Sequence, residues 1–387
     1  MPHLWSWFTN ISKAVSHFIY HASSLFSYIS QTPQFIKSAS FTPKKSHDLE
    51  SNVPFDVPSG TSICETYTVR LQPQHDLDMV GVGASGQVYN VDDQVVLKTC
   101  RIFEPPSSDA SQSDHWHYAS DTVFHFNMLE DERTVLKLLQ IRPHLHIIEA
   151  IDTDQPEGIY LRKYRRLAAE MVSTQSHRIR LYRDITDALR HLHSLGIAHA
   201  DIRIDNILFD HHGSAILCDF SAASPFGQTN LVFPDLPLPV NGPFPTLSEA
   251  SDMFAMASLI FRMEHGAAPE LSFDQGTLIL PEIRSGNQGI DEVIQKAWLG
   301  QYSSTSEMLQ RLIHIDAQTS HRGEGTRPIP ESGELFKDQI QRWRVHRKKE
   351  FGSVLAGLLS RHQLDELADC YSIDMDADLR LTHYCVP

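Results

Sequence analysis

Near residue 90, apolar and polar residues alternate over short runs. Further along the chain, apolar residues recur at the spacing of a helix. Residues 87–91 and 94–99 alternate as β-strands do, on either side of a polar turn. Residues 122–140, and a later stretch that ends near residue 195, repeat apolar residues every three or four positions, which is typical of amphipathic helices. This order predicts an α+β fold, in which a small antiparallel β-sheet lobe with one helix precedes a larger, mostly α-helical lobe.

The N-terminal part of the chain has a different pattern. Its first 47 residues contain no Asp or Glu, and apolar residues recur there at steps of three and four. This spacing predicts an amphipathic helix over residues 4–29. Such a helix either packs on the protein's own surface or contacts a membrane peripherally, because aromatic-rich amphipathic helices bind at lipid interfaces. No run approaches the ~18 uninterrupted apolar residues of a membrane span, so we expect a soluble protein. We expect it to be cytoplasmic, with peripheral membrane association as the alternative.

Breaks in the pattern divide the chain into five stretches. They are an amphipathic helix and linker at 1–47, a polar linker at 48–73, a main domain at 74–313, a Gly- and Pro-containing linker at 314–334 and a helical tail at 335–387. Within the main domain, residues 101–120 are rich in Ser, Pro and Asp and are expected to form a loop. The apolar residues of the tail are expected to pack on the larger lobe, with recognition of a partner as the alternative.

Charge and cysteine content exclude several classes of protein. The chain of 387 residues carries 33 Lys and Arg against 48 Asp and Glu, a net charge of −15. This balance argues against a nucleic-acid binder, because phosphate backbones require clustered cations. The five cysteines are scattered and form no CxxC pair, so neither a disulfide framework nor a zinc ribbon is expected. Four closely spaced histidine pairs lack a partnering Cys or Glu and are expected to be surface or packing residues: His115 and His117, His144 and His146, His191 and His193, and His211 and His212.

The first candidate for chemistry is the glycine-rich segment VGVGASGQVYNV. Glycines at this spacing let the backbone approach a phosphate closely, because no Cβ intervenes. In a dinucleotide-binding fold a helix would begin directly after the third glycine, whereas here a strand pattern follows and the glycines lie in a hairpin. Taken alone, the segment could equally be an ordinary glycine-rich turn. The residues that we expect to contact a nucleotide are Val80, Gly81, Val82, Gly83, Ala84, Ser85, Gly86 and Val88, together with Lys98.

Lys98 lies within the apolar run of residues 94–99. A lysine at this distance from a phosphate loop can pair with phosphate oxygens, provided that a carboxylate orients it. We choose Glu132, since apolar residues follow it at spacings that place it beside the buried face of the helix. Glu130 is the alternative.

Three further polar residues follow the helix that ends near residue 195. Asp201 and Asn206 stand five positions apart on a loop, where an Asp can accept a hydroxyl proton and an Asn can hold a metal. A turn and a second apolar strand then lead to Asp219. A carboxylate at the end of a strand suits a phosphate-bridging Mg²⁺, which prefers a few hard oxygen ligands together with phosphate.

Residues 74–313 resemble the eukaryotic-type protein kinase domain, in particular the divergent kinase-like proteins of filamentous fungi. The glycine-rich segment is similar to the glycine-rich loop, Lys98 to the VAIK lysine and Glu132 to its helix partner. Residues 199–206 are similar to the HRDxxxxN loop and residues 219–221 to DFG. Residues 251–255 resemble the start of the buried helix whose Asp anchors the catalytic loop, and Trp298 resembles a Trp near the end of the larger lobe.

Four positions depart from the family pattern. Ala200 replaces the Arg of HRD, which removes the cation that binds a phosphorylated activation loop in many members. Arg203 stands where serine/threonine kinases usually carry Lys, and it keeps a positive charge beside the γ-phosphate. Ser221 replaces the Gly of DFG. The APE motif is not recognisable at residues 237–240.

The resemblance implies a non-RD protein kinase that uses ATP and Mg²⁺ to phosphorylate Ser or Thr in a protein substrate. Asp201 would be the catalytic base, with Arg203, Lys98 and Glu132 as the other catalytic residues, and Asn206 and Asp219 would hold the metal. A second interpretation is a nucleotide-binding pseudokinase that serves as a scaffold. It is motivated by Ala200, Ser221 and the missing APE motif. A small-molecule kinase of the aminoglycoside or choline type is the third, because Ala200 fits its H-G-D-x-x-x-x-N loop.

Overall fold

The computed structural model describes residues 69–83, 85–230, 241–274, 277–319, 333–373 and 375. All of them belong to Tyr67–Pro387, the second of the two units into which the chain divides. The amphipathic helix expected at 4–29, Ala84 and the segment 237–240 lie outside the described residues.

The first lobe is built on a five-stranded antiparallel sheet with the strand order β1-β2-β3-β5-β4. Its strands are β1 (Met79–Val82), β2 (Gln87–Asn90), β3 (Val95–Thr99), β4 (Ala150–Asp152) and β5 (Ile159–Arg162). Every residue of β3 is buried, because β2 and β5 flank this strand. The alternating runs near residue 90 therefore form the hairpin that the sequence predicts.

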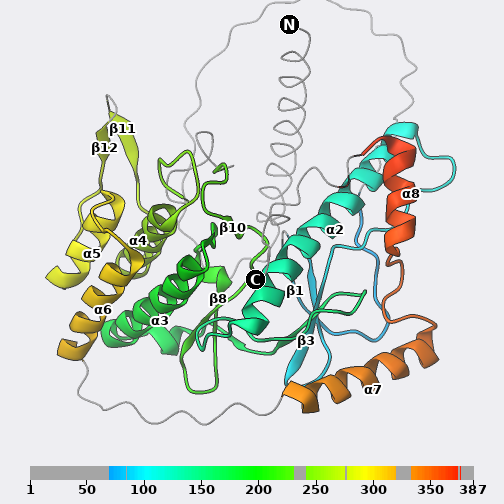
Figure 1. Ribbon diagram of the computed structural model, residues 1–387, viewed down its shortest axis with the longest axis horizontal. Coiled ribbons are helices and arrows are strands. Elements are labelled where there is room, and N and C mark those ends of the chain that lie inside the picture. The colour runs from blue at the N-terminus through cyan, green and yellow to red at the C-terminus, as the bar shows by residue number, and fades with distance from the viewer. Residues whose placement is uncertain are drawn as a thin grey trace, which may run out of the picture. The chain divides into compact units, whose positions relative to one another are not determined.

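One long helix, α2 (Gln112–Ile141), lies beside this sheet and contacts β4 (Figure 1). It begins ten residues before the expected start at 122, so the loop predicted for residues 101–120 is wrong over its second half. The reason is a capping box: the Ser111 side chain accepts from the Asp114 N–H at 3.2 Å, and the Asp114 carboxylate accepts from the Ser111 N–H at 3.1 Å. Together these bonds satisfy backbone groups at the start of the helix.

The second lobe is mostly helical. Its helices are α3 (Gln175–Ser194), α4 (Glu249–His265), α5 (Gln288–Trp298) and α6 (Thr305–Thr319), with the 3₁₀ turns η1 (Ala169–Val172) and η2 (Ile204–Asn206). Its short strands are β6 (Arg165–Arg166), β7 (Ile197–Ala198), β8 (Ile207–Phe209), β9 (Ala215–Leu217), β10 (Ser224–Pro225), β11 (Ser272–Asp274) and β12 (Thr277–Ile279). Helix α3 packs along α6 and α4, and its core face carries Ile185 and Leu189, both fully buried. The α+β prediction, with a sheet lobe before a helical lobe, is confirmed.

The tail forms two helices, α7 (Gly333–Phe351) and α8 (Arg361–Tyr371). Helix α8 packs against α2 (Figure 1). Helix α7 packs against β4. The expectation that the tail packs on the larger lobe is therefore wrong. Its apolar residues pack instead on the sheet lobe, where Leu355 and Leu364 are buried.

None of the helices in the described part of the chain is both long and apolar enough to cross a membrane.

Candidate active site

Lys98 lies between two carboxylates that come from distant parts of the chain. Its Nζ is 2.6 Å from Glu132 Oε2 on α2 and 3.0 Å from Asp219 Oδ1, two residues beyond the end of β9. Lys98 is 6% exposed and Glu132 only 1%. The structure thus brings together three residues that the sequence analysis selected separately.

Electrostatics keep Lys98 charged. Burial alone would lower its pKa, but Asp219 and Glu132 together raise the pKa above its ordinary value. The Asp219 side chain is partly buried, which would raise its pKa, yet the adjacent Lys98 lowers this pKa well below the usual range. Glu132 responds in the opposite direction: burial raises its pKa, and the attraction of Lys98 is opposed by the like charge of Asp219. The group therefore contains an ammonium ion held by an ionised Asp219.

Helix α2 determines which glutamate reaches Lys98. Val135, Leu136 and Leu139 are buried, and this apolar stripe turns Glu132 toward the sheet. The other oxygen of Glu132, Oε1, accepts a hydrogen bond from the Phe220 N–H at 3.2 Å. The alternative, Glu130, instead pairs with Arg133 at 2.8 Å.

One oxygen of the Asp219 carboxylate, Oδ1, accepts several hydrogen bonds. Ser221 Oγ donates to Oδ1 at 2.9 Å and Ser85 Oγ at 3.3 Å, in addition to Lys98. The residue has a φ of 63°, a left-handed conformation that is uncommon outside glycine. The serine that departs from the DFG pattern thus helps to orient the carboxylate, a contact that the sequence analysis did not foresee.

A third carboxylate, that of Asp201, lies on the loop before η2. Its Oδ2 accepts from Asn206 Nδ2 at 2.7 Å, and the same amide nitrogen donates to the Asp201 backbone carbonyl at 2.9 Å. Arg203 Nε lies 3.4 Å from this carboxylate and its side chain is about half exposed. The backbone carbonyl of Asn206 accepts from the Cys218 N–H at 3.0 Å, which joins this loop to the segment that carries Asp219.

The loop with Asp201 is anchored from α4. Asp252 is 0% exposed, and its carboxylate accepts the backbone N–H groups of His199 at 2.7 Å and Ala200 at 2.9 Å. His193 Nε2 lies 2.9 Å from the same carboxylate. The buried Asp expected in residues 251–255 therefore fixes the backbone just before Asp201. Trp298 is also buried, and its Nε1 donates to Ser258 Oγ at 3.0 Å.

The glycine-rich segment forms the hairpin between β1 and β2. The Gly83 N–H donates to the Gly86 carbonyl at 2.8 Å. A Cβ on Gly86 would lie 2.1 Å from the Thr99 carbonyl oxygen, whereas a Cβ on Gly83 would meet nothing within 4 Å. A side chain at position 86 would thus collide with β3, whereas a side chain at position 83 would have no neighbour within 4 Å.

Two arginines that the sequence analysis missed hold this hairpin by its carbonyls. Arg101 donates to Gly83 O at 3.0 and 2.7 Å, and Arg166 Nη2 donates to Val80 O at 2.8 Å. The remaining residues expected at the nucleotide lie in the same strands: Gly81 and Val82 in β1, and Val88 in β2.

A family model described as the protein kinase domain matches residues 75–233. The chain contains a protein kinase domain. The match ends before Asp252 and Trp298, so the boundary expected at 313 stays a prediction.

Curated relatives of the kinase domain match at low identity. CBL-interacting protein kinase 22 of Oryza sativa subsp. japonica is 28% identical over 171 residues, 40% of this chain and 37% of that protein. MAP kinase-interacting serine/threonine-protein kinase 2 of Xenopus laevis is 20% identical over 328 residues, 70% of this chain and 66% of that protein. Serine/threonine-protein kinase ppk8 of Schizosaccharomyces pombe is 25% identical over 161 residues, 40% of this chain and 30% of that protein. The aligned region spans less than two thirds of the length of each of these relatives.

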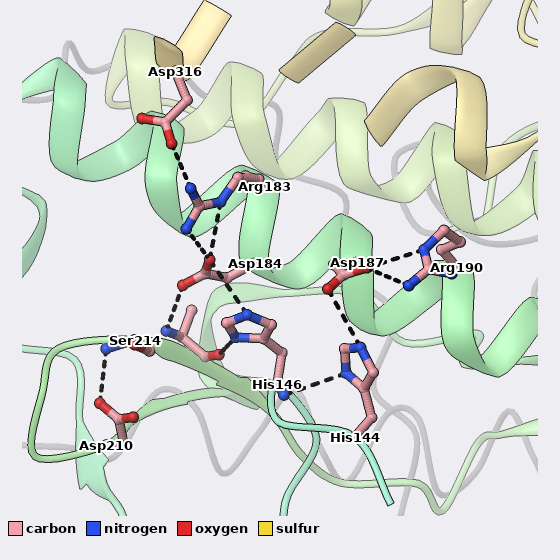
Figure 2. A network of polar contacts seen from close by, with 10 residues as sticks. His144, His146, Arg183, Asp184, Asp187, Arg190, Asp210, Ser214 and Asp316 are labelled. Carbon is pink, nitrogen blue, oxygen red and sulfur yellow. Dashed lines mark hydrogen bonds and ion pairs between the residues drawn. The ribbon is translucent and has the colours of Figure 1, made fainter. Parts of the chain in front are cut away.

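The kinase domain also holds β9 in place through a polar network on α3 (Figure 2). Asp184 Oδ2 accepts from the Ala215 N–H at 3.2 Å, and Asp184 Oδ1 lies 3.5 Å from His146 Nε2. The other ring nitrogen of His146 is 2.9 Å from the Ala215 carbonyl, and the His146 backbone carbonyl accepts from the Leu217 N–H at 2.8 Å. Because β9 leads directly to Asp219, these contacts fix the strand that delivers that carboxylate.

A second part of this network contains the other histidines of the region. His144 Nε2 lies 3.3 Å from Asp187 Oδ2, and its ring stacks on His191 with the centroids 4.9 Å apart. Arg190 donates to the same Asp187 at 2.7 Å. These histidines thus make packing and polar contacts between α3 and the segment that follows α2.

Proposed function

We propose that the chain is an ATP-dependent protein kinase that transfers the γ-phosphate of Mg-ATP to Ser or Thr hydroxyl groups of proteins. The observation that carries this proposal is the convergence of Lys98, Glu132 and Asp219 beside the linked pair of Asp201 and Asn206. Phosphoryl transfer depends mainly on positioning and electrostatics, and this set supplies both.

The residues fit a magnesium-bound nucleotide. Lys98 offers a fixed ammonium ion for the α- and β-phosphates. At Gly83 no other atom lies within 4 Å of the position that a Cβ would take, so a phosphate would approach the hairpin backbone there. The donors to Asp219 converge on Oδ1, and the amide nitrogen of Asn206 is directed to Asp201. The Asp219 carboxylate and the Asn206 Oδ1 would therefore be the oxygen ligands for Mg²⁺. When bound, this ion would neutralise charge on the phosphate oxygens.

Asp201 is the group that acts on the acceptor. Its carboxylate is held by Asn206 and remains about one-third exposed, so a substrate hydroxyl can reach it and transfer its proton. Arg203 stands beside it and would offset charge on the transferred phosphoryl group.

The absence of a cation at position 200 bears on regulation. Ala200 is buried, and its backbone N–H donates to Asp252. A methyl side chain there cannot bind a phosphorylated loop, so we propose a non-RD kinase that does not need loop phosphorylation to order Asp201.

The preference for Ser and Thr is supported by the names of two relatives, the Xenopus laevis and Schizosaccharomyces pombe proteins, which are both called serine/threonine-protein kinases.

The test is transfer from γ-labelled ATP by the purified full chain. The acceptors are a generic Ser/Thr-rich protein, a Tyr-containing polymer and a mixture of aminoglycosides and choline. We expect label on Ser or Thr of the protein. Stabilisation by Mg-ATP without transfer would instead identify a pseudokinase scaffold, and label on the small molecules alone would identify a small-molecule kinase.

A further inference from the structure

The tail contacts the turn between β4 and β5 through a buried ion pair. Glu157 in this turn is 3% exposed, and both of its oxygens contact the Arg344 guanidinium of α7, one of them at 3.1 Å from Nη2. Tyr160 Oη also donates to Glu157, at 2.7 Å. A bidentate arginine suits a buried carboxylate, because it supplies two charge-assisted hydrogen bonds. Loss of Arg344 would leave Glu157 buried without its cation.

The same turn is bound to α2 from its other side. Arg133 Nη1 donates to the backbone carbonyls of Thr153, Gln155 and Gly158, the last two at 3.1 Å. Arg133 directly follows Glu132 in the sequence. The tail therefore holds this turn at Glu157. The turn holds α2 next to Glu132, the residue that contacts Lys98.

Helix α8 makes a second contact with α2, beside which it runs (Figure 1). Ala368 of α8 is 1% exposed. The Arg361 guanidinium lies over the Phe126 ring at 5.7 Å, and Asn127 Nδ2 donates to the Met375 carbonyl at 3.0 Å. The tail thus supports α2 at two separate places.

We propose that the tail positions Glu132 for its contact with Lys98, and that Arg344 is a positioning residue which acts through Glu157 and Arg133. The inference rests on the proposed function of Lys98 as the ligand of the nucleotide phosphates. A misplacement of about 1 Å at such a contact can reduce turnover about 10²-fold, so a helix that carries a 2.6 Å ion pair needs firm support. The tail supplies that support within the same chain.

The experiment compares Arg344→Ala with Arg342→Ala in the full chain, each with and without Glu132→Gln. Arg342 is an exposed residue of the same helix, so it is the matched control. We expect Arg344→Ala to reduce kcat/KM for Mg-ATP about tenfold, which corresponds to ~1.4 kcal/mol, and Arg342→Ala to leave it unchanged. In the Glu132→Gln background Arg344→Ala should cause no further loss, because both changes act on one contact. An equal loss in both backgrounds would overturn the proposal, as would equal activity of the two arginine variants.

Hydrogen exchange provides a readout that does not require activity. Amides of α2 should exchange faster in folded Arg344→Ala than in Arg342→Ala. If the parent chain transfers no phosphate, the proposed function fails, and this measurement alone decides whether the tail holds α2. Equal exchange rates would show that it does not.

A second pair of variants applies if Arg344→Ala fails to fold. Ala368→Arg places a long cation against α2, and Cys370→Arg adds the same side chain at an exposed position of α8. We expect the first to lower kcat/KM for Mg-ATP and to accelerate exchange in α2, and the second to do neither. Identical behaviour of the two variants would contradict the role of the tail.

Discussion

Asp252 Oδ1 accepts a hydrogen bond from the backbone N–H of Ala200 at 2.9 Å. Ala200 has a φ of 64°, a left-handed conformation that costs a non-glycine residue about 1–2 kcal/mol. The buried carboxylate therefore stabilises a backbone turn that the residue itself disfavours, one position before the proposed base Asp201. Helix α4 thus determines the position of a group to which it contributes no catalytic atom.

Replacement of Asp252 by Ala should destabilise the protein strongly. Three donors, including the N–H of His199 and the ring of His193, would be left buried without their acceptor. We expect the free energy of unfolding to fall by about 3 kcal/mol. Denaturant unfolding measures this change, with the exposed Glu270→Ala as the control. Equal stability of the two variants would show that the anchor is unimportant.

Gly86 and Gly83 should respond differently to substitution by Ala. At Gly86 the added methyl would collide with the Thr99 carbonyl, so we expect a loss of about 2 kcal/mol or more in the free energy of unfolding. At Gly83 the methyl meets open space, so stability should change by less than about 1 kcal/mol while the affinity for ATP falls. Thermal unfolding and ATP titration test both expectations. A Gly83→Ala protein with the ATP affinity of the parent would argue against a phosphate site at this hairpin.

Asp201→Asn should separate chemistry from binding. This change removes the proposed acceptor of the hydroxyl proton, so we expect kcat to fall by about 10²–10⁴-fold while the Kd for Mg-ATP stays close to that of the parent. Asp205→Asn, at an exposed position of the same loop, is the control and should keep its turnover. Steady-state kinetics and calorimetric titration give the two quantities. A parental kcat in Asp201→Asn would exclude Asp201 as the base.

Asp187 should contribute to stability only above moderately acidic pH. The hydrogen bond with His144, and then Arg190, hold the pKa of this carboxyl below its ordinary value (Figure 2). Its ionised form therefore stabilises the fold above the unfolded pKa of about 3.9, and this contribution disappears as the pH falls toward the lower folded pKa. The difference in unfolding free energy between the parent and Asp187→Asn should be largest near neutral pH and should shrink below about pH 4. Urea unfolding across this range measures it, and a gap that widens in acid would contradict the assignment.

Local patterns were sufficient to predict the hairpin and the choice of Glu132. Strand alternation and the buried helix face both depend on residues close in sequence, and they place Glu132 rather than Glu130 beside Lys98. The start of α2 was also encoded locally, in the capping box of Ser111 and Asp114, but the Pro- and Ser-containing composition around it favoured a loop.

No local sequence pattern predicts where the tail packs. Arg344 and Glu157 are far apart in the sequence, and an arginine in a basic helix is typical of a solvent-exposed face. Only the folded arrangement shows that the side chain of this arginine is 12% exposed and pairs with the buried Glu157. The same holds for Ser85 and Ser221, whose hydroxyl groups meet on Asp219 from two separate loops.

Labelled-phosphate transfer by the purified full chain, measured beside Asp219→Asn, tests the central claim most directly. The account predicts Mg²⁺-dependent transfer by the parent to Ser or Thr, and loss of both the transfer and the stabilisation by Mg-ATP in the variant. Equal transfer by the parent and by Asp219→Asn would contradict it, because Asp219 would then be neither a metal ligand nor the partner that Lys98 needs.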